Sequence, residues 1–327
     1  MRVTQSQLTR QYLQNSNTSL ENMSKINNKI LSQRSFNRAS EDPVGASKAL
    51  IIRRGLEKCD MYKSNLDTAQ GLFENAEQSM MSISGIATTV TDSILQGVNG
   101  TQGTGEKKIV AEQIRNMAKE MISQANSQYA ERQMFGGTNN STSPFVYNAS
   151  TKLLTFNGVD INTNDINLFP NTKDINIDVG LGIKFDAAGN VDPQTVMNIA
   201  LNGAKILGHG VDADGNPNNL IAAAFAAADA LEANDTGKAL VLLDKTKDAS
   251  STLMIGITNI GNQQQAIDYS RTRVEDELFS LQKSQQAVEG INLEVESTNY
   301  KEAELAYNAT IQMASQVIPK SIFDFMR

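Results

Sequence analysis

The sequence predicts a mainly α-helical protein. We expect a long antiparallel helical coiled-coil bundle built from paired N- and C-terminal segments, with a small α+β outer domain inserted between them. Prolines are absent from residues 44–143 and 218–318, and since a proline inside a helix costs about 3 kcal/mol, both spans can form long helices. Apolar residues recur there at alternating spacings of three and four, which is the pattern of a heptad seam. The middle of the chain instead collects four of the six prolines with many Asn, Asp and Gly residues.

The first long helix is expected to start within RASEDPVGASKAL, residues 38–50. Asp42 can cap its N-terminus, and Pro43 suits the first helical position because its missing N–H is not needed there. Glycine-rich residues 97–105 end the helix, and a second helix follows over about 106–129. The predicted seam of the first helix consists of Ile52, Gly55, Cys59, Tyr62, Leu66, Ala69, Phe73, Ala76, Met80, Ile83, Ala87, Val90 and Ile94.

The seam returns near the C-terminus and predicts a helix that packs against the early ones. Its members are Ile257, Ile260, Gln264, Ile267, Arg271, Val274, Leu278, Leu281, Gln285, Val288, Asn292 and Val295. In the middle, residues 144–158 are typical of a β-hairpin and 175–186 of a second strand pair. Residues 219–234 and 237–248 are expected to be helices, which completes the α+β outer domain.

Three parts follow from these elements. We expect terminal inner-core helices from 1–42 and 290–327, a coiled-coil bundle domain from 43–137 and 246–289, and an outer domain over 138–245. Apolar residues are too sparse in 1–42 to offset the entropy of ordering it alone. Pairing of the two terminal parts would bury them, and their charges of +3 (six Lys/Arg against three Asp/Glu) and −2 (three against five) favour that pairing.

The composition excludes several classes of function. The net charge of −7 and the lack of a Lys/Arg cluster argue against nucleic-acid binding, and no apolar run is long enough for membrane insertion. With one histidine, His209, and one cysteine, Cys59, we expect no metal site, cofactor or catalytic constellation. Cys59 on the seam is expected to be a small buried residue, although Lys58 and Lys63 leave a reactive thiolate open. The N-terminal residues lack a signal-peptide pattern, so we expect any export to occur without cleavage.

Three stretches together resemble the flagellin superfamily, in which N- and C-terminal helices pair around a variable inserted domain. They are RASEDPVGASKAL at 38–50, ERQMFGGTNNSTSPF at 131–145 and IPKSIFDFMR at 318–327, and the resemblance covers about 1–143 and 250–327. Flagellins usually have a leucine-rich C-terminus and an Asn-Gly after the second helix, where this chain has residues 323–327 (FDFMR) and 134–137 (MFGG). These departures favour a hook-associated member of the superfamily over a filament-forming one.

The resemblance implies a structural protein and not an enzyme: an adaptor that joins the hook-associated ring to the flagellin filament through helical self-assembly. It implies unfolded export through the flagellar type III export apparatus with an export chaperone, and a location in the extracellular flagellum. The implied partners are copies of itself in a ring or helical array, hook-associated protein 1 and flagellin. The side chains expected at the inner subunit contacts are Leu8, Leu13, Ile30, Leu31, Tyr307, Ile311, Ala314, Val317, Ile318, Ile322 and Phe325.

Two other functions stay open at this point. A minor flagellin that builds the filament itself would share the same terminal helices. An adhesin or glycan-binding protein would use the Asn- and Asp-rich loops of residues 138–245, displayed on a flagellar stalk.

Overall fold

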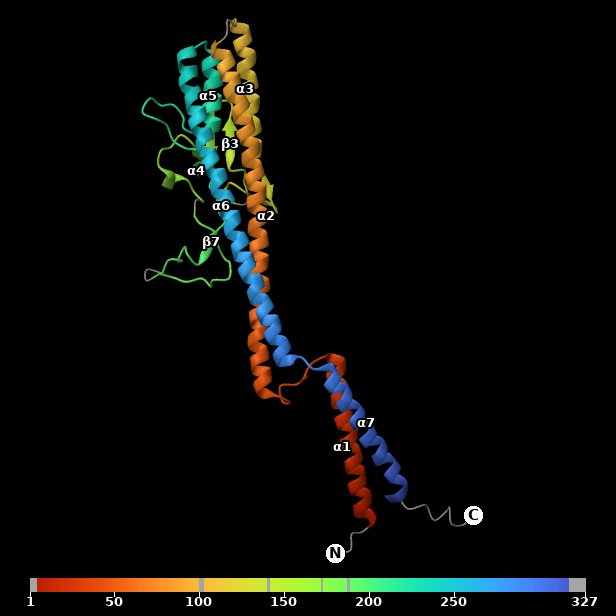
Figure 1. The fold of residues 1–327 in the computed structure, drawn as a ribbon. Helices are drawn as coiled ribbons and strands as arrows, with labels where there is room; N and C mark the ends of the chain where they lie inside the picture. The colour runs from red at the N-terminus through yellow and green to blue at the C-terminus, as the bar shows by residue number, and fades with distance from the viewer. Residues whose placement is uncertain (1–4, 100–102, 140–141, 172, 187–188, 318–327) are drawn as a thin grey trace. The chain divides into compact units, whose positions relative to one another are not determined.

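The computed structural model describes residues 5–99, 103–139, 142–171, 173–186 and 189–317 (Figure 1). The chain forms two compact units: unit 1 combines residues 1–59 and 275–327, and unit 2 comprises residues 60–274. Two long helices, α2 (Pro43–Asn99) and α6 (Thr236–Glu289), contribute residues to both units. The predicted helical class with a small α+β insertion is confirmed. The division into three parts stays a prediction about which parts fold independently.

Helix α2 forms as the sequence predicts. It begins at Pro43, and the Asp42 Oδ1 atom accepts a hydrogen bond from the Gly45 backbone N at 2.9 Å. It ends at Asn99, directly before the glycine-rich stretch. Its predicted seam is buried without interruption from Leu66 to Ile94. Period and capping residues therefore sufficed to locate this helix of 57 residues.

Helix α6 runs antiparallel to α2 within unit 2. Gln264 Nε2 donates to Glu77 Oε2 at 2.8 Å, and one heptad later Arg271 Nη2 donates to Asp67 Oδ1 at 2.7 Å. Gln264 and Arg271 in the predicted C-terminal seam are thus explained by polar contacts with α2, whereas Asn292 of that seam lies beyond the end of α6. The predicted helix over 237–248 is not separate, because α6 begins at Thr236 and continues without a break to Glu289.

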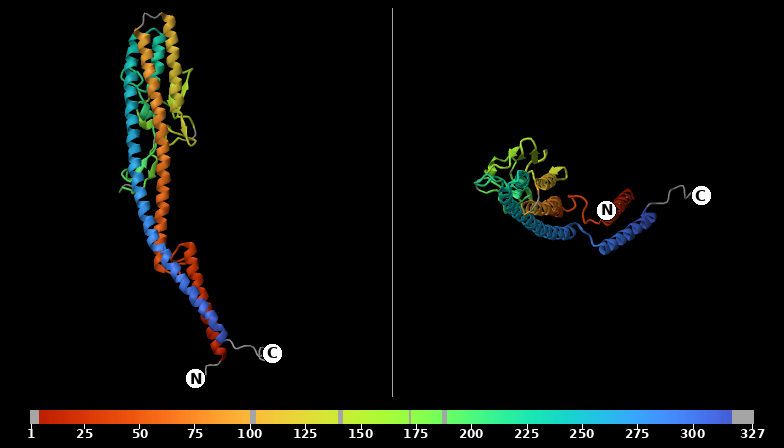
Figure 2. Two further views of the ribbon diagram at one scale, coloured as in Figure 1. Left: turned by 45° about the vertical axis from the view of Figure 1, so that its right-hand side comes forward. Right: turned by 90° about the horizontal axis from the view of Figure 1, so that it is seen from above.

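Two shorter helices, α3 (Thr104–Ala125) and α5 (Leu220–Glu232), complete the bundle of unit 2 (Figures 1 and 2). Helix α5 packs against α3, and its many alanines allow a close approach. Asn219 Oδ1 caps α5 by accepting from two of its first backbone amides. Helix α3 ends before the predicted residue 129, because the chain turns into a short hairpin of β1 (Gln128–Tyr129) and β2 (Arg132–Gln133).

The predicted hairpin over 144–158 is confirmed. Strand β3 (Phe145–Asn148) pairs antiparallel with β4 (Leu153–Phe156), which also pairs with β5 (Val159–Asp160). The Asn126 side chain joins the hairpin to the end of α3 through both the N–H and the C=O of Phe145, at 2.9 and 2.7 Å. The Tyr147 ring stacks on Phe225 of α5 with centroids 3.9 Å apart. Polar and aromatic contacts therefore fix the small sheet to the bundle.

The prediction of a second strand pair within residues 175–186 is wrong about which strands pair. Strand β6 (Asn176–Asp178) pairs with the distant β7 (Val196–Asn198) and not within residues 175–186. After β6 the chain is held to α6, because Arg273 Nη2 donates to the Val179 carbonyl at 2.6 Å. A 3-10 turn, η1 (Ile166–Leu168), and the short helix α4 (Gly203–Leu207) complete the elements of unit 2.

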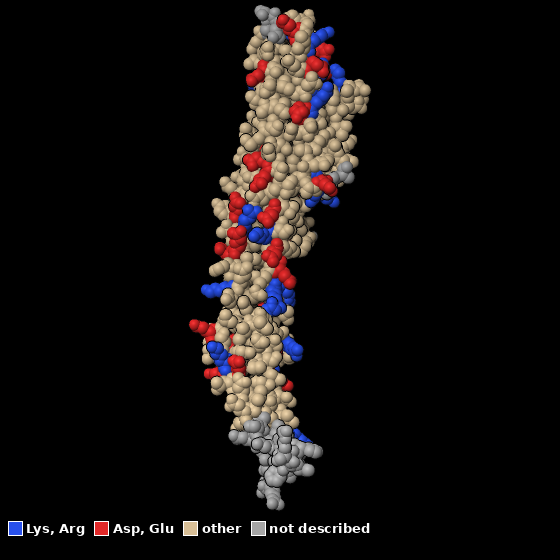
Figure 3. Space-filling model, turned by 90° about the vertical axis from the view of Figure 1, so that its right-hand side faces the viewer, with Lys and Arg blue, Asp and Glu red and all other residues tan. Residues whose placement is uncertain are grey.

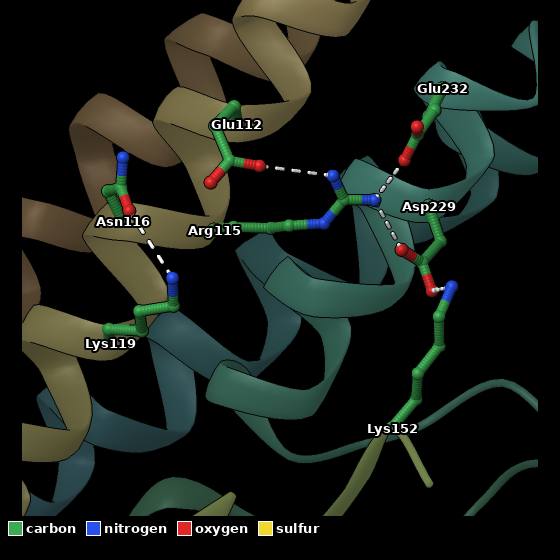
Figure 4. Close-up of polar contacts among 7 residues, drawn as sticks. All are labelled: Glu112, Arg115, Asn116, Lys119, Lys152, Asp229 and Glu232. Atoms are coloured by element: carbon green, nitrogen blue, oxygen red, sulfur yellow. Dashed lines mark hydrogen bonds and ion pairs between the residues drawn. The ribbon is translucent and has the colours of Figure 1, made fainter. Parts of the chain in front are cut away.

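An ion network centred on Arg115 joins three elements of unit 2 (Figure 4). Arg115 extends from α3 toward α5, where its Nη2 atom contacts Asp229 at 2.7 Å and also Glu232. Lys152, in the turn between β3 and β4, contacts the other Asp229 oxygen at 2.7 Å. Burial opposes ionisation of Asp229, but Lys152 and Arg115 outweigh it and lower its pKa. The network therefore ties α3, α5 and the hairpin together.

Replacing Arg115 with Met is expected to lower the free energy of unfolding by about 1–2 kcal/mol. The change removes the charge-assisted contacts that this side chain, which is 20% exposed, makes with three carboxylates, Glu112, Asp229 and Glu232. Lys119→Met on the same helix is the matched control, because among the contacts of the described residues Lys119 bonds only to Asn116, at 3.5 Å. Because the pKa of Asp229 is lower in the folded chain than in the unfolded chain, its ionised carboxylate stabilises the fold above the unfolded pKa. That stability is lost as the pH falls through the folded pKa. The difference between wild type and Arg115→Met in urea titrations should therefore shrink below about pH 4. Equal losses in both variants would contradict this role.

Candidate assembly surface

The terminal helices α1 (Gln5–Ser32) and α7 (Leu293–Val317) pair with each other in unit 1 (Figures 1 and 2). Half-buried residues recur on both helices at spacings of three and four, as on a coiled-coil seam. On α1 they include Tyr12, Ser16, Ser19, Met23, Ile26 and Ile30, and on α7 Glu296, Tyr300, Ala303, Tyr307 and Thr310. Among the described residues of these helices no apolar side chain is fully buried. The pairing expected from the sequence is present, but it leaves much apolar surface in contact with solvent.

A leucine stripe lies on a second face of α1. Leu13, Leu20 and Leu31 are 53%, 44% and 75% exposed. Leu13 and Leu31 are 18 residues apart, which is five turns at about 3.6 residues per turn, and Leu20 lies within a small rotation of the same line. The stripe is about a quarter turn away from the seam. Within unit 1, helix α7 therefore covers only one of the two apolar faces of α1.

Helix α7 exposes apolar side chains in several directions. Leu305, opposite the seam, is 74% exposed. Leu293 and Ile311 share one flank, and Val295 and Met313 share the other, because each pair is again 18 residues apart. A helix with apolar residues on all sides is normally buried by several neighbours. Among the elements that the structure describes in unit 1, the helix paired with α7 is α1.

An open groove in unit 1, about 1640 Å³ in volume, runs between the second half of α1, the connector after it and α7. Leu20, Ile26 and Leu31 contribute apolar surface to it. Its charged lining residues have both signs: Lys25, Lys29 and Arg38 against Glu21, Glu41, Asp42 and Glu302. The groove therefore offers apolar surface to a further helix but no excess of positive charge.

The predicted contact residues fall into four groups. Ile30 and Tyr307 are half-buried on the seam between α1 and α7. Leu13, Leu31 and Ile311 are exposed. Leu8, Ala314 and Val317 belong to the two helices, but their side chains are outside the description. Ile318, Ile322 and Phe325 lie outside the described residues. The role of this set in subunit contacts stays a prediction.

Five exposed apolar residues of the two helices were not in the predicted set: Leu20, Leu293, Val295, Leu305 and Met313. A signal for the first was available, since Leu20 follows Leu13 by one heptad. The predicted set already includes both faces of α1, because Leu13 and Leu31 lie on the leucine stripe and Ile30 on the seam. Leu305 lies opposite the seam of α7, where a soluble helix usually carries polar residues.

Residues considered for chemistry serve packing instead. Cys59 is buried on the seam. His209 packs edge-on against Phe169, with ring centroids 5.9 Å apart. Asp212 of unit 2, which lies outside these candidates, also has a structural role. Its pKa is lowered to about 2, first by the Lys245 ammonium and then by the backbone N–H of Asn216, so its carboxylate belongs to a hydrogen-bonded turn. Across the described ranges, no group of His, Cys, Asp and Glu could hold a metal ion.

The charged residues form no extended patch of one sign on the face shown in Figure 3, where Lys and Arg alternate with Asp and Glu. Among the described helices, none is both long enough and apolar enough to cross a membrane. The exposed apolar faces of α1 and α7 thus stand out as the candidate functional surface.

Comparison with known proteins places the first part of the chain. Residues 3–140 match the family model of the bacterial flagellin N-terminal helical region. This range includes α1, α2 and α3. Among curated protein sequences, none matches the chain.

Solved structures match the fold. A protein of Vibrio parahaemolyticus named as a flagellar hook-associated protein matches with a TM-score of 0.61 at 18% identity, covering 76% of this chain and 100% of that one. Flagellar hook-associated protein 3 of Legionella pneumophila matches with a TM-score of 0.54 at 10% identity, covering 73% and 98%. FlgL of Bacillus cereus matches with a TM-score of 0.50 at 15% identity, covering 72% and 99%. Residues 3–140 therefore match a bacterial flagellin N-terminal helical region, and the chain has the fold seen in these flagellar hook-associated proteins.

Proposed function

We propose that this protein is a structural adaptor of the bacterial flagellum, which joins the hook-associated ring to the flagellin filament by assembling into a ring or helical array. The observation that carries the proposal is the exposed apolar surface of α7, which extends over several faces of one helix. Apolar surface of this kind favours association with other chains. Fold and family agree, since they are those of structural flagellar proteins.

Copies of this chain are the first proposed partners. The exposed apolar surface of α7 in one copy packs into the groove between α1 and α7 of the next copy, against Leu20, Ile26 and Leu31. A contact between two different surfaces of identical subunits continues from copy to copy and forms a ring or a helical tube. The eleven predicted contact residues, from Leu8 to Phe325, belong to this proposal.

The further partners follow from the same proposal. One end of the array contacts hook-associated protein 1, and the other contacts flagellin. Before assembly the chain passes unfolded through the type III export apparatus, and an export chaperone covers its apolar terminal helices. The protein then resides in the extracellular flagellum and acts by shape, not by catalysis.

Deletion of the gene from the native bacterium tests the proposal. Without the adaptor, exported flagellin cannot attach to the hook, so flagellin monomers should accumulate in the culture medium and hooks should lack filaments. The intact gene should restore the filaments. The alternative of a minor flagellin is supported by the N-terminal family match and predicts a different result: shorter or fewer filaments without leakage of another flagellin.

A further inference from the structure

Two connectors of unit 1 meet at the end of α6. Residues 33–42 join α1 to α2, and residues 290–292 join α6 to α7. Arg34 and Gly290 form an antiparallel β-bridge. The Ser35 backbone N donates to the Glu289 carbonyl at 2.7 Å, and the Ser35 hydroxyl donates to the Val288 carbonyl at 3.2 Å. Backbone hydrogen bonds thus join two segments from opposite ends of the sequence.

The side chain of Glu289 is buried within this contact. Glu289 is only 5% exposed, and its carboxylate lies 2.7 Å from Arg53 Nη2 and 3.9 Å from Arg34 Nε. The same carboxylate raises the pKa of Arg53. A buried carboxylate is costly unless it is paired, so the two arginines make this burial possible.

Helix stability does not explain a glutamate at this position. Glu289 is the last residue of α6, where the helix dipole disfavours negative charge and favours Lys or Arg. Gly290, the next residue, suits the end of the helix, because a Cβ atom there would lie 2.4 Å from the Gln286 carbonyl of α6 itself. Glu289, in contrast, suits the contact between the connectors better than it suits the helix.

Capping residues define where α7 and α2 begin, next to the contact between the two connectors. Asn292 Oδ1 accepts from the Glu294 backbone N at 3.1 Å at the start of α7, and Asp42 caps the start of α2. Phe36 fills the space beside Gly45, with its ring carbon 2.9 Å from the position of a Cβ atom. We call Arg34, Ser35, Arg53, Glu289 and Gly290 the clasp.

The geometry points to the clasp as a positioning device, in which Glu289 holds the base of α1 beside the base of α7 before assembly. Bringing two distant segments together costs loop-closure entropy, and the first helical contacts are the least favourable. Once the clasp holds the C-terminal end of α1 beside the N-terminal end of α7, the pairing of the two helices extends from that point without a further loop-closure cost. The assembly step rests on the proposed function, whereas the clasp itself belongs to a single chain.

Hydrogen exchange of the full-length monomer tests the clasp directly. In Glu289→Gln and Arg53→Met, amides in residues 33–37 and 288–291 should exchange roughly tenfold faster than in wild type, because the connectors separate more often. Arg54→Met is the matched control, since exposed Arg54 bonds only to the Leu50 carbonyl among its described contacts, at 3.4 Å. Arg53→Lys keeps the charge and should retain part of the protection.

Assembly onto purified hooks gives a second measurement. Glu289→Gln should assemble several-fold more slowly than wild type and Arg54→Met, while thermal unfolding of its helices stays unchanged. Wild-type exchange at the clasp in Glu289→Gln would overturn the inference and leave the proposed function intact. Faster exchange with an unchanged assembly rate would overturn the positioning role. Failure of the wild type to assemble would instead overturn the proposed function, because the exchange result does not depend on it.

Discussion

A chain that ends after Gly290 is expected to stay folded and soluble but to lose assembly onto hooks completely. The truncation removes α7 (Leu293–Val317) with its exposed apolar side chains, and it removes the seam partner of α1. The helices of unit 2 keep their buried core, because none of those core residues lies beyond Val274. Circular dichroism should show helix loss limited to the terminal segments, with a preserved cooperative transition.

The truncated chain retains Glu289 and Arg53, so failure of assembly would not reflect loss of that ion pair. Sedimentation should find it monomeric at concentrations where the intact chain associates. Normal capping of purified hooks by the truncated chain would contradict the proposed role of α7.

A single charge on the exposed face of α7 is expected to have the next largest effect. Replacing Leu305 with Asp removes about 2 kcal/mol of burial at the subunit contact, a factor of roughly 30 in affinity. The cost of placing an unpaired carboxylate there adds to this loss. Helix formation within one copy should change little, because Leu305 lies opposite the seam and is 74% exposed.

Asn308→Asp is the matched control for this substitution. It introduces the same charge three residues away at an exposed polar position of the same helix. Association measured by light scattering should fall by more than 30-fold in Leu305→Asp and by only a small factor in Asn308→Asp. Equal effects would indicate that general electrostatics, and not burial of Leu305, governs association.

The elements predicted best were those set by local signals. The seam of α2 from Leu66 to Ile94 follows a strict period of three and four residues. Asp42 and Pro43 mark the start of the helix itself. The hairpin over residues 144–158 was predictable because its strands are neighbours in sequence. In these cases the interactions that decide the structure lie within a few residues of each other.

Features that depend on distant partners could not be predicted in the same way. Strand β6 pairs with β7 across an intervening loop that Arg273 of α6 helps to position. The burial of Glu289 could not be predicted from the sequence, because it depends on Arg34 and Arg53, which lie more than 200 residues earlier. A lone glutamate at the end of a helix carries no local sign of such partners.

The candidate surface was predicted in kind but not in extent. Ile30 and Tyr307 lie on the seam, and Leu13 and Leu31 on the second face of α1, yet Leu20 and Leu305 were not predicted. In a monomeric protein the face opposite a seam meets water and is normally polar. A helix that joins several neighbours carries more than one apolar face.

Hydrogen exchange of α1 and α7, compared between the dilute monomer and the chain assembled on hooks, tests the central claim most directly. Because these helices bury little apolar surface within one copy, their amides should exchange quickly in the monomer, and assembly should slow them by roughly 100-fold or more. Slow exchange throughout both helices in the dilute monomer, unchanged on assembly, would contradict the claim that neighbouring subunits stabilise them.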